Sequence, residues 1–313
     1  MTRYILKRVF FAFVTVCIVF TVVFMLLRFM PTSGYFPREM INSLDEGTKN
    51  AYLRSIGLLD PPFVQLKNFV IKLFRGDLGR SITVYPKVPI VTILAEKIPV
   101  SAAFGFASLV FGMAAGLLLG MFMVRFKSRF GDNIGTAYVI AVRSIPSLIY
   151  FFLIQVWVSK ALKLPLVYYN DRFLSWILPV ICLSLGSIAW YAIWLRRFMV
   201  DEENKDYVKF ARVKGLSQKY ILRKHIFRNA IIPLAIYLPS DLLFIISGSL
   251  IIESLFVIPG TGGLLTTAIR RQDNTLVQVL VLMYSAMSVA GVLLGDLLAA
   301  FVDPRIKLTE KED

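Results

Sequence analysis

The sequence predicts an all-α polytopic membrane protein with six transmembrane helices and an extracytoplasmic subdomain between the first two. Of its 313 residues, 57% are hydrophobic and 18% charged, and the mean hydropathy is +0.68. This composition excludes an ordinary soluble domain. Six apolar segments are also long enough to cross a hydrocarbon core of roughly 30 Å, for which a helix needs about 20 residues. They are approximately residues 9–27, 98–124, 134–158, 173–195, 231–257 and 276–301.

The distribution of positive charge predicts the orientation in the membrane. The formal net charge is +15, a value that also occurs in nucleic-acid-binding proteins. Here the basic residues gather in loops beside apolar segments, so the lipid bilayer explains them better than a nucleic acid does. If every segment crosses, three basic clusters share one side, which the positive-inside rule makes the cytoplasm, and both termini lie there. The clusters are Arg3/Lys7/Arg8, Arg125/Lys127/Arg129 and residues 196–228.

Residues 1–29 are predicted to form the first transmembrane helix. Basic residues precede its apolar run, as in a signal peptide, but the run is too long and no small-x-small cleavage site precedes Pro31. We therefore expect this helix to be retained.

Residues 30–97 are predicted to form an ordered extracytoplasmic subdomain. Their composition is mixed, and Asp60-Pro61 and Gly76-Asp77-Leu78-Gly79 are typical of turns. A second break is expected after the fifth apolar segment, where Pro259 precedes a glycine cluster, as a re-entrant or interfacial turn.

Two charged residues are expected near the middle of the bilayer. Arg143 lies nine residues into the third segment and Asp241 ten residues into the fifth, so each is roughly 13 to 15 Å deep. An unpaired charge at that depth costs at least about 2.5 to 3.5 kcal/mol, so each should face a partner or a wet cavity. We expect Arg143, Asp241 and the nearby Ser247 to line a translocation pathway or its gate. A structural ion pair, or a pair with a partner subunit, is an equally weighted alternative.

The loop of residues 196–230 is predicted to hold two short helices. Its acidic residues come first and its basic residues later, which suits the helix dipole, and Gly215 followed by Leu216-Ser217 is typical of a helix end and a second helix cap.

Nothing in the sequence predicts a cofactor or metal site on this chain. Cys17 and Cys182 lie in different apolar segments and are expected to be small hydrophobic residues, and His225 is the single histidine. No Gly-x-x-x-x-Gly-Lys-Ser/Thr motif is present, so ATP would have to be hydrolysed by another chain.

The loop motifs resemble those of ABC importer permeases of the dipeptide and oligopeptide type. The loop has Ala211, then Gly215, then His225-x-x-Arg228-Asn229-Ala230-x-x-Pro233. Further matching stretches extend the resemblance over essentially the whole chain: residues 4–8, 57–65, 76–81, 253–265 and 303–307. The chain departs from the family pattern at Asn274-Thr275, where an aromatic residue and a proline are usual, and at Lys209 and Phe210, where Glu and Ala are usual.

The resemblance implies a type I ABC importer permease fold, with residues 98–301 as the core permease domain and residues 302–313 as a cytoplasmic tail. It implies a non-catalytic subunit of the bacterial cytoplasmic membrane that forms the pathway for di- or oligopeptides. The implied partners are a second homologous permease in a heterodimer, two ATPase subunits that hold ATP and Mg, and an extracytoplasmic solute-binding protein. In such a protein the loop couples to the ATPase through Lys209, Phe210, Ala211, Arg212, Gly215, Leu216 and Ser217.

Other functions are weighed against this one. A nickel or metal-chelate importer permease shares the same architecture. An ion-coupled secondary transporter would act without an ATPase and use Arg143 and Asp241 as coupling groups. A membrane hydrolase is disfavoured, because one histidine without an intramembrane acid pair supplies neither an activated nucleophile nor a metal cluster.

Overall fold

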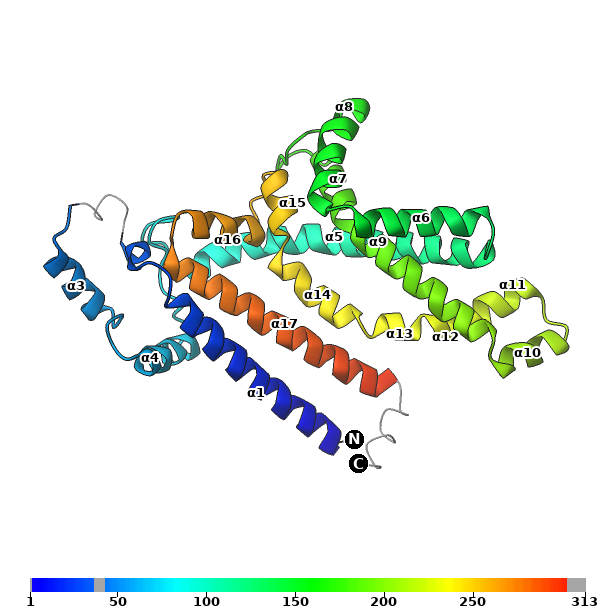
Figure 1. The fold of residues 1–313 in the computed structure, drawn as a ribbon, viewed down its shortest axis with the longest axis horizontal. Helices are drawn as coiled ribbons and strands as arrows, with labels where there is room; N and C mark the ends of the chain where they lie inside the picture. Colours follow the sequence, from blue (N-terminus) through cyan, green and yellow to red (C-terminus); the bar gives the residue numbers. More distant parts are fainter. Residues whose placement is uncertain (1, 37–42, 303–313) are drawn as a thin grey trace.

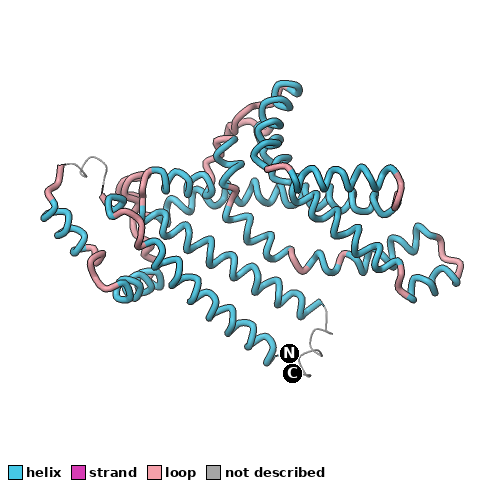
Figure 2. The backbone as a smooth tube through the Cα atoms, viewed as in Figure 1, coloured by secondary structure: helices cyan, strands magenta, loops and turns pink. Residues whose placement is uncertain are grey.

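The protein is helical throughout the part of the chain that the structure describes, residues 2–36 and 43–302 of a computed structural model (Figure 2). Within those ranges the extended pairing is limited to an isolated bridge between Arg80 and Pro89. This confirms the all-α prediction. The sequence stretch 303–307 and most of the proposed tail lie outside the described residues.

Four long helices in the described ranges have the length and composition to cross a membrane: α1 (Thr2–Leu27), α5 (Ile90–Arg125), α9 (Leu174–Glu203) and α17 (Asn274–Val302). α5 begins eight residues before the apolar segment that predicted it, because its first two turns pack against α16 and α17. α1 and α17 lie side by side (Figure 1).

Three glycines allow α5 and α9 to pack closely. Gly112, Gly116 and Gly120 recur every four residues and so share one face of α5. A Cβ added at any of them would lie 2.7 to 2.9 Å from an atom of α9, too close for any side chain. The small-residue spacing thus sets the distance between the two helices, as it does in many membrane helix pairs.

The third apolar segment is bent, where a single straight span had been predicted. α6 (Phe130–Ser144) and α7 (Ser147–Leu153) meet at 108°. Ile145 is extended because the following Pro146 disfavours the helical conformation in the residue before it. The chain then continues through a π-helical turn, Ile154–Val158, into α8 (Ser159–Leu162), which rises away from the bundle (Figure 1).

The fifth apolar segment is divided into short helices, again where one span had been predicted. They are α13 (Ile232–Ala235), α14 (Leu238–Ser247) and α15 (Leu250–Leu255), and α12 (Arg228–Ala230) precedes them. Between the last two, Gly248 has φ +68° and ψ −178°, a conformation that only glycine adopts readily. By length and composition, four helices among the described residues can each span a membrane, and the number is five if α6 to α8 together form one span. The predicted count of six transmembrane helices stays a prediction.

The two ends of the molecule carry different structures. At one end lie the 3-10 turn Thr32–Tyr35, α3 (Glu46–Ser55), α4 (Pro62–Phe74) and the start of α5. At the other end lies the helical hairpin of α10 (Asp206–Val213) and α11 (Gln218–Tyr220) (Figure 1). α16 (Thr261–Arg270) joins the broken helix to α17.

Candidate functional site: the helical hairpin and the membrane cavity

The hairpin turns at Gly215, where the sequence placed the junction of two helices. Gly215 has φ +74°, and Leu216 N–H donates to the Ala211 carbonyl at 3.3 Å, which closes α10 as a glycine C-terminal motif does. Ser217 Oγ then accepts from Tyr220 N at 3.4 Å and caps α11. No described atom lies within 4 Å of the position where a Cβ would be at Gly215. Glycine is therefore needed here for its positive φ and not for its small volume.

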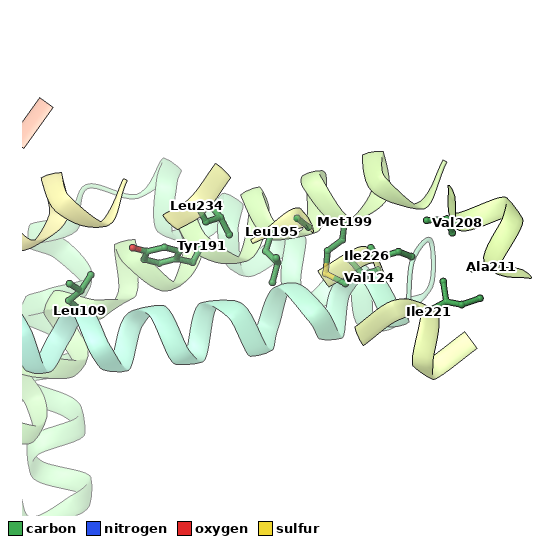
Figure 3. Packing of buried hydrophobic residues seen from close by; sticks show 11 residues of the cluster. Leu109, Val124, Tyr191, Leu195, Met199, Val208, Ala211, Ile221, Ile226 and Leu234 are labelled. Carbon is green, nitrogen blue, oxygen red and sulfur yellow. The ribbon is translucent and has the colours of Figure 1, made fainter. Parts of the chain in front are cut away.

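The inner face of α10 is part of the hydrophobic core of the membrane helices. Val208 and Ala211, one turn apart, are buried against Met199 of α9 and against Ile221 and Ile226 beyond the turn. Figure 3 shows this cluster running without interruption from Leu109 and Tyr191 to the hairpin. α10 packs on the π-helical turn Ile221–Phe227, which in turn packs on α9, so the hairpin and the membrane helices share one hydrophobic core.

The outer face of α10 is apolar and exposed. Phe210 is 68% and Val213 86% exposed, and they lie one turn apart, beside the partly exposed Leu216. Large exposed apolar groups gathered in one place are typical of a protein interface. All but one of the seven residues that the resemblance assigned to ATPase coupling are exposed: Lys209, Phe210, Arg212, Gly215, Leu216 and Ser217. Ala211 faces the chain's own core, and sequence reasoning missed Val213, which the i, i+3 spacing from Phe210 would have revealed.

Polar contacts fix the hairpin to the end of α9. Arg212 pairs with Glu203 at 2.9 Å, and Glu203 also pairs with Lys127 at 3.4 Å. Tyr207 donates to Glu202 and accepts from Asn229 Nδ2 at 2.9 Å. Burial, together with the Glu202 carboxylate, raises the pKa of Tyr207.

Lys209 forms an exposed pair with Asp206 at 2.9 Å within α10. Its ammonium hydrogen bond lowers the pKa of Asp206. Such an exposed pair contributes little to stability, so Lys209 remains available to a partner.

A buried ion pair that the sequence did not suggest joins α6 to α9. Arg196 donates to both carboxylate oxygens of Asp132, at 2.6 and 2.7 Å, and Ser128 N adds a third bond at 3.0 Å. Asp132 is buried at the first turn of α6, where the helix dipole favours a negative charge. The pair orients the bent helix relative to α9.

A cavity of about 200 Å³ with a mainly apolar lining lies among α5, α9, α14 and α15. Its polar lining includes Asp241, which accepts a hydrogen bond from Tyr191 at 2.7 Å. The predicted link between Asp241 and Arg143 is not formed, and within residues 2–36 and 43–302 Arg143 makes no ion pair. The reason is that α6 packs on α5 and α9, whereas α14 packs on α5 and α17. Arg143 is instead exposed, and Ser247 ends α14 with a side chain outside the described set.

Glu253 is a buried acid on the wall of the same cavity. It accepts from Ser101 Oγ at 2.8 Å, Gly263 N at 3.0 Å and Ser249 N at 3.2 Å. Ser101 in turn accepts from Thr261 N, so the carboxylate joins α5, α15 and the start of α16. Its place as an acid inside an apolar segment was the sequence signal that could have identified it.

Asp273 holds the segment before α5 on the turn between α16 and α17. The buried Oδ2 accepts from Ser81 Oγ at 2.5 Å and from three successive backbone N–H groups, those of residues 82 to 84, at 2.9 to 3.0 Å. Asn274, one of the departures from the family pattern, donates to the Pro31 carbonyl at 2.7 Å.

The described side chains suggest no metal centre, since in residues 2–36 and 43–302 no three His, Cys, Asp or Glu residues gather in a ligand arrangement. His225 instead lies against the rings of Tyr207 and Tyr220.

Apolar helices joined by glycine packing, an interrupted helix beside a cavity that holds two acidic side chains, and a hairpin packed on the same hydrophobic core are together typical of a membrane transport component. The chain belongs to the family of binding-protein-dependent transport system inner membrane components, whose model matches residues 112–308.

Two named relatives are similar to this chain. The dipeptide transport system permease protein DppB of Lactococcus lactis subsp. cremoris is 31% identical, with 98% of this chain and all of that protein covered. The oligopeptide transport system permease protein AmiC of Streptococcus pneumoniae is 35% identical over 67% of this chain and 43% of its own length. Among solved structures, an amino acid ABC transporter with histidines matches with a TM-score of 0.51 and 16% identity. That match covers 68% of this chain and 94% of the other, and it shows likeness of fold alone.

Proposed function

We propose that this chain is the permease subunit of an ATP-driven importer and forms the pathway for di- or oligopeptides. The peptide substrate is supported by the names of relatives that match nearly the full chain. The coupling role is carried by one observation: α10 has an exposed apolar edge on one face and membrane-core residues on the other.

In this proposal, ATPase subunits bind at Phe210, Val213 and Leu216, with Lys209, Arg212, Gly215 and Ser217 shaping the contact. When ATP closes the two ATPase subunits, they displace α10, and Val208 and Ala211 transmit the motion to α9 and α5. The cavity beside Asp241 lies between these helices and the broken fifth segment, so the same motion alters its access. ATP and Mg are held by the ATPase subunits, and this chain is non-catalytic.

The proposed topology has six crossings, with α6 to α8 and α12 to α15 as the third and fifth. Both termini and the hairpin are cytoplasmic. Residues 30–97 form the extracytoplasmic subdomain and receive the solute-binding protein, and residues 98–301 are the core that pairs with a second, homologous permease. The position of residues 43–89 at the end opposite the hairpin supports this division (Figure 1).

Photo-cross-linking from α10 tests the coupling role. A photoreactive residue at Phe210 is expected to cross-link an ATPase subunit in the assembled complex, whereas one at Phe74, equally apolar and 87% exposed at the opposite end, is expected not to. Cross-linking from both positions or from neither would contradict the proposal.

Measuring uptake of a peptide and of a nickel chelate by the same complex then distinguishes the peptide importer from the metal-chelate importer. The ion-coupled alternative predicts uptake without any ATPase subunit.

A further inference from the structure

A cavity of about 600 Å³ lies between the end of α1, α4 and the segment before α5. It is separate from the cavity beside Asp241 and from the hairpin. Its charged lining is four basic residues and one acidic residue: Arg28, Lys72, Arg80, Lys87 and Asp77. A volume of this size suits a small ligand, and the charge balance favours an anion.

Arg28 is held in place by neighbouring side chains, but one of its hydrogen-bond donors has no acceptor. Its guanidinium lies 4.2 Å over the ring of Phe24, donates to Tyr35 Oη at 3.0 Å and reaches Gln278 Oε1 at 3.4 Å. Its Nε is buried and has no hydrogen-bond partner in the part of the chain that the structure describes. Burial lowers the pKa of Arg28, but a guanidinium remains charged in proteins. A buried donor without an acceptor is costly, so a bound oxyanion would stabilise this arrangement.

The cavity lies at the boundary between hydrocarbon and headgroups. Arg28 directly follows the apolar span Leu6–Leu27, and Gln278 is in the first turn of the span that begins at Asn274. Lipid phosphates occupy this level of a bilayer, just outside the hydrocarbon core.

α4 presents two different faces. Gln65, Asn68 and Lys72 line the cavity, next to Phe69, whose ring lies 5.6 Å from that of Phe24. On the other face Phe63 and Phe74, eleven residues and thus about three turns apart, are 74% and 87% exposed. A short helix with one apolar exposed face at the end of a span is suited to lie in the membrane interface.

We propose that this cavity binds the phosphate of an anionic phospholipid headgroup in the leaflet opposite the hairpin. Arg28 and Lys72 contact the phosphate, and the apolar face of α4 contacts the acyl chains. A free phosphate ion offers the same oxyanion without acyl chains, so the test compares the two.

The test uses the purified full-length chain in detergent, titrated with phosphatidylglycerol or phosphatidylcholine and observed by native mass spectrometry. We expect phosphatidylglycerol to bind at least tenfold more tightly than phosphatidylcholine and to resist millimolar inorganic phosphate. Arg28→Gln and Lys72→Gln are each expected to weaken phosphatidylglycerol about tenfold, as the loss of a charge-assisted hydrogen bond does. Lys160→Gln, the same change at an exposed lysine of α8 and so outside the cavity and outside α4, is expected to have less than a twofold effect.

Lys72 is exposed, so its variant tests the site even if Arg28→Gln fails to fold. Equal binding of the two lipids, an equal loss with Lys160→Gln, or displacement by inorganic phosphate would each overturn the lipid site.

Discussion

Val208→Ala is predicted to loosen α10 without altering its outer face. Val208 is fully buried, so the change removes two methyl groups from the core at about 0.8 kcal/mol each, and the cavity left behind brings the local cost to about 2 kcal/mol. Since 1.4 kcal/mol corresponds to a factor of ten, the amide hydrogens of α10 should exchange about 30-fold faster if they exchange by local opening.

The assay is hydrogen exchange of the purified chain, with Val213→Ala as the matched control. Val213 is 86% exposed on the same helix, so the same chemical change should leave exchange in the isolated chain within about twofold. It should instead weaken ATPase-subunit binding, whereas Val208→Ala should retain binding and transport less peptide per ATP hydrolysed. Equal exchange in the two variants would refute the division of α10 into an inner and an outer face.

Three further changes test other parts of the account. Asp132→Asn should lower the free energy of unfolding by about 1 to 3 kcal/mol, measured by denaturation, because it leaves the partly buried Arg196 without its charge partner. The exposed Asp206→Asn should leave the melting temperature unchanged, and similar losses in both variants would contradict the structure. Gly215→Asn should be tolerated, whereas Gly215→Val should destabilise the hairpin by about 1 to 2 kcal/mol, because asparagine adopts the left-handed backbone conformation of Gly215 more readily than valine does. Loss of ATPase binding with both variants would show instead that the small volume of Gly215 is required at the contact. Because the pKa of Tyr207 is raised in the folded hairpin, the neutral phenol contributes to stability in full below its ordinary pKa of 10.0, and this contribution is lost as pH rises through the higher folded pKa. Hydrogen exchange in α10 should therefore become faster at alkaline pH, and Tyr207→Phe should abolish this acceleration. An unchanged pH profile in the variant would exclude Tyr207 as its cause.

Apolar length was enough to predict α1, α5, α9 and α17, because a long hydrophobic helix has few alternatives to crossing the membrane. It could not predict continuity. Pro146 and Gly248 interrupt the third and fifth segments through backbone conformation, which a count of apolar residues does not measure.

The same limit explains why the ion pair considered for Arg143 and Asp241 is not formed. Depths for Arg143 and Asp241 were counted along straight helices, but the two residues lie on helices with different neighbours, and Tyr191 is the partner of Asp241.

The hairpin was better predicted, because its glycine, cap and charge order are local signals. Which face of α10 lies inward depends on packing against α9 and the π-helical turn Ile221–Phe227, so Ala211 was expected at the partner surface and is found in the core.

The most direct test of the account is uptake of a labelled dipeptide into proteoliposomes that hold the complete complex. We predict uptake that requires both ATP and the solute-binding protein, and that is abolished by Phe210→Glu but not by Phe210→Leu. Uptake by this chain without ATPase subunits, driven by an ion gradient and unaffected by Phe210→Glu, would contradict the central claim.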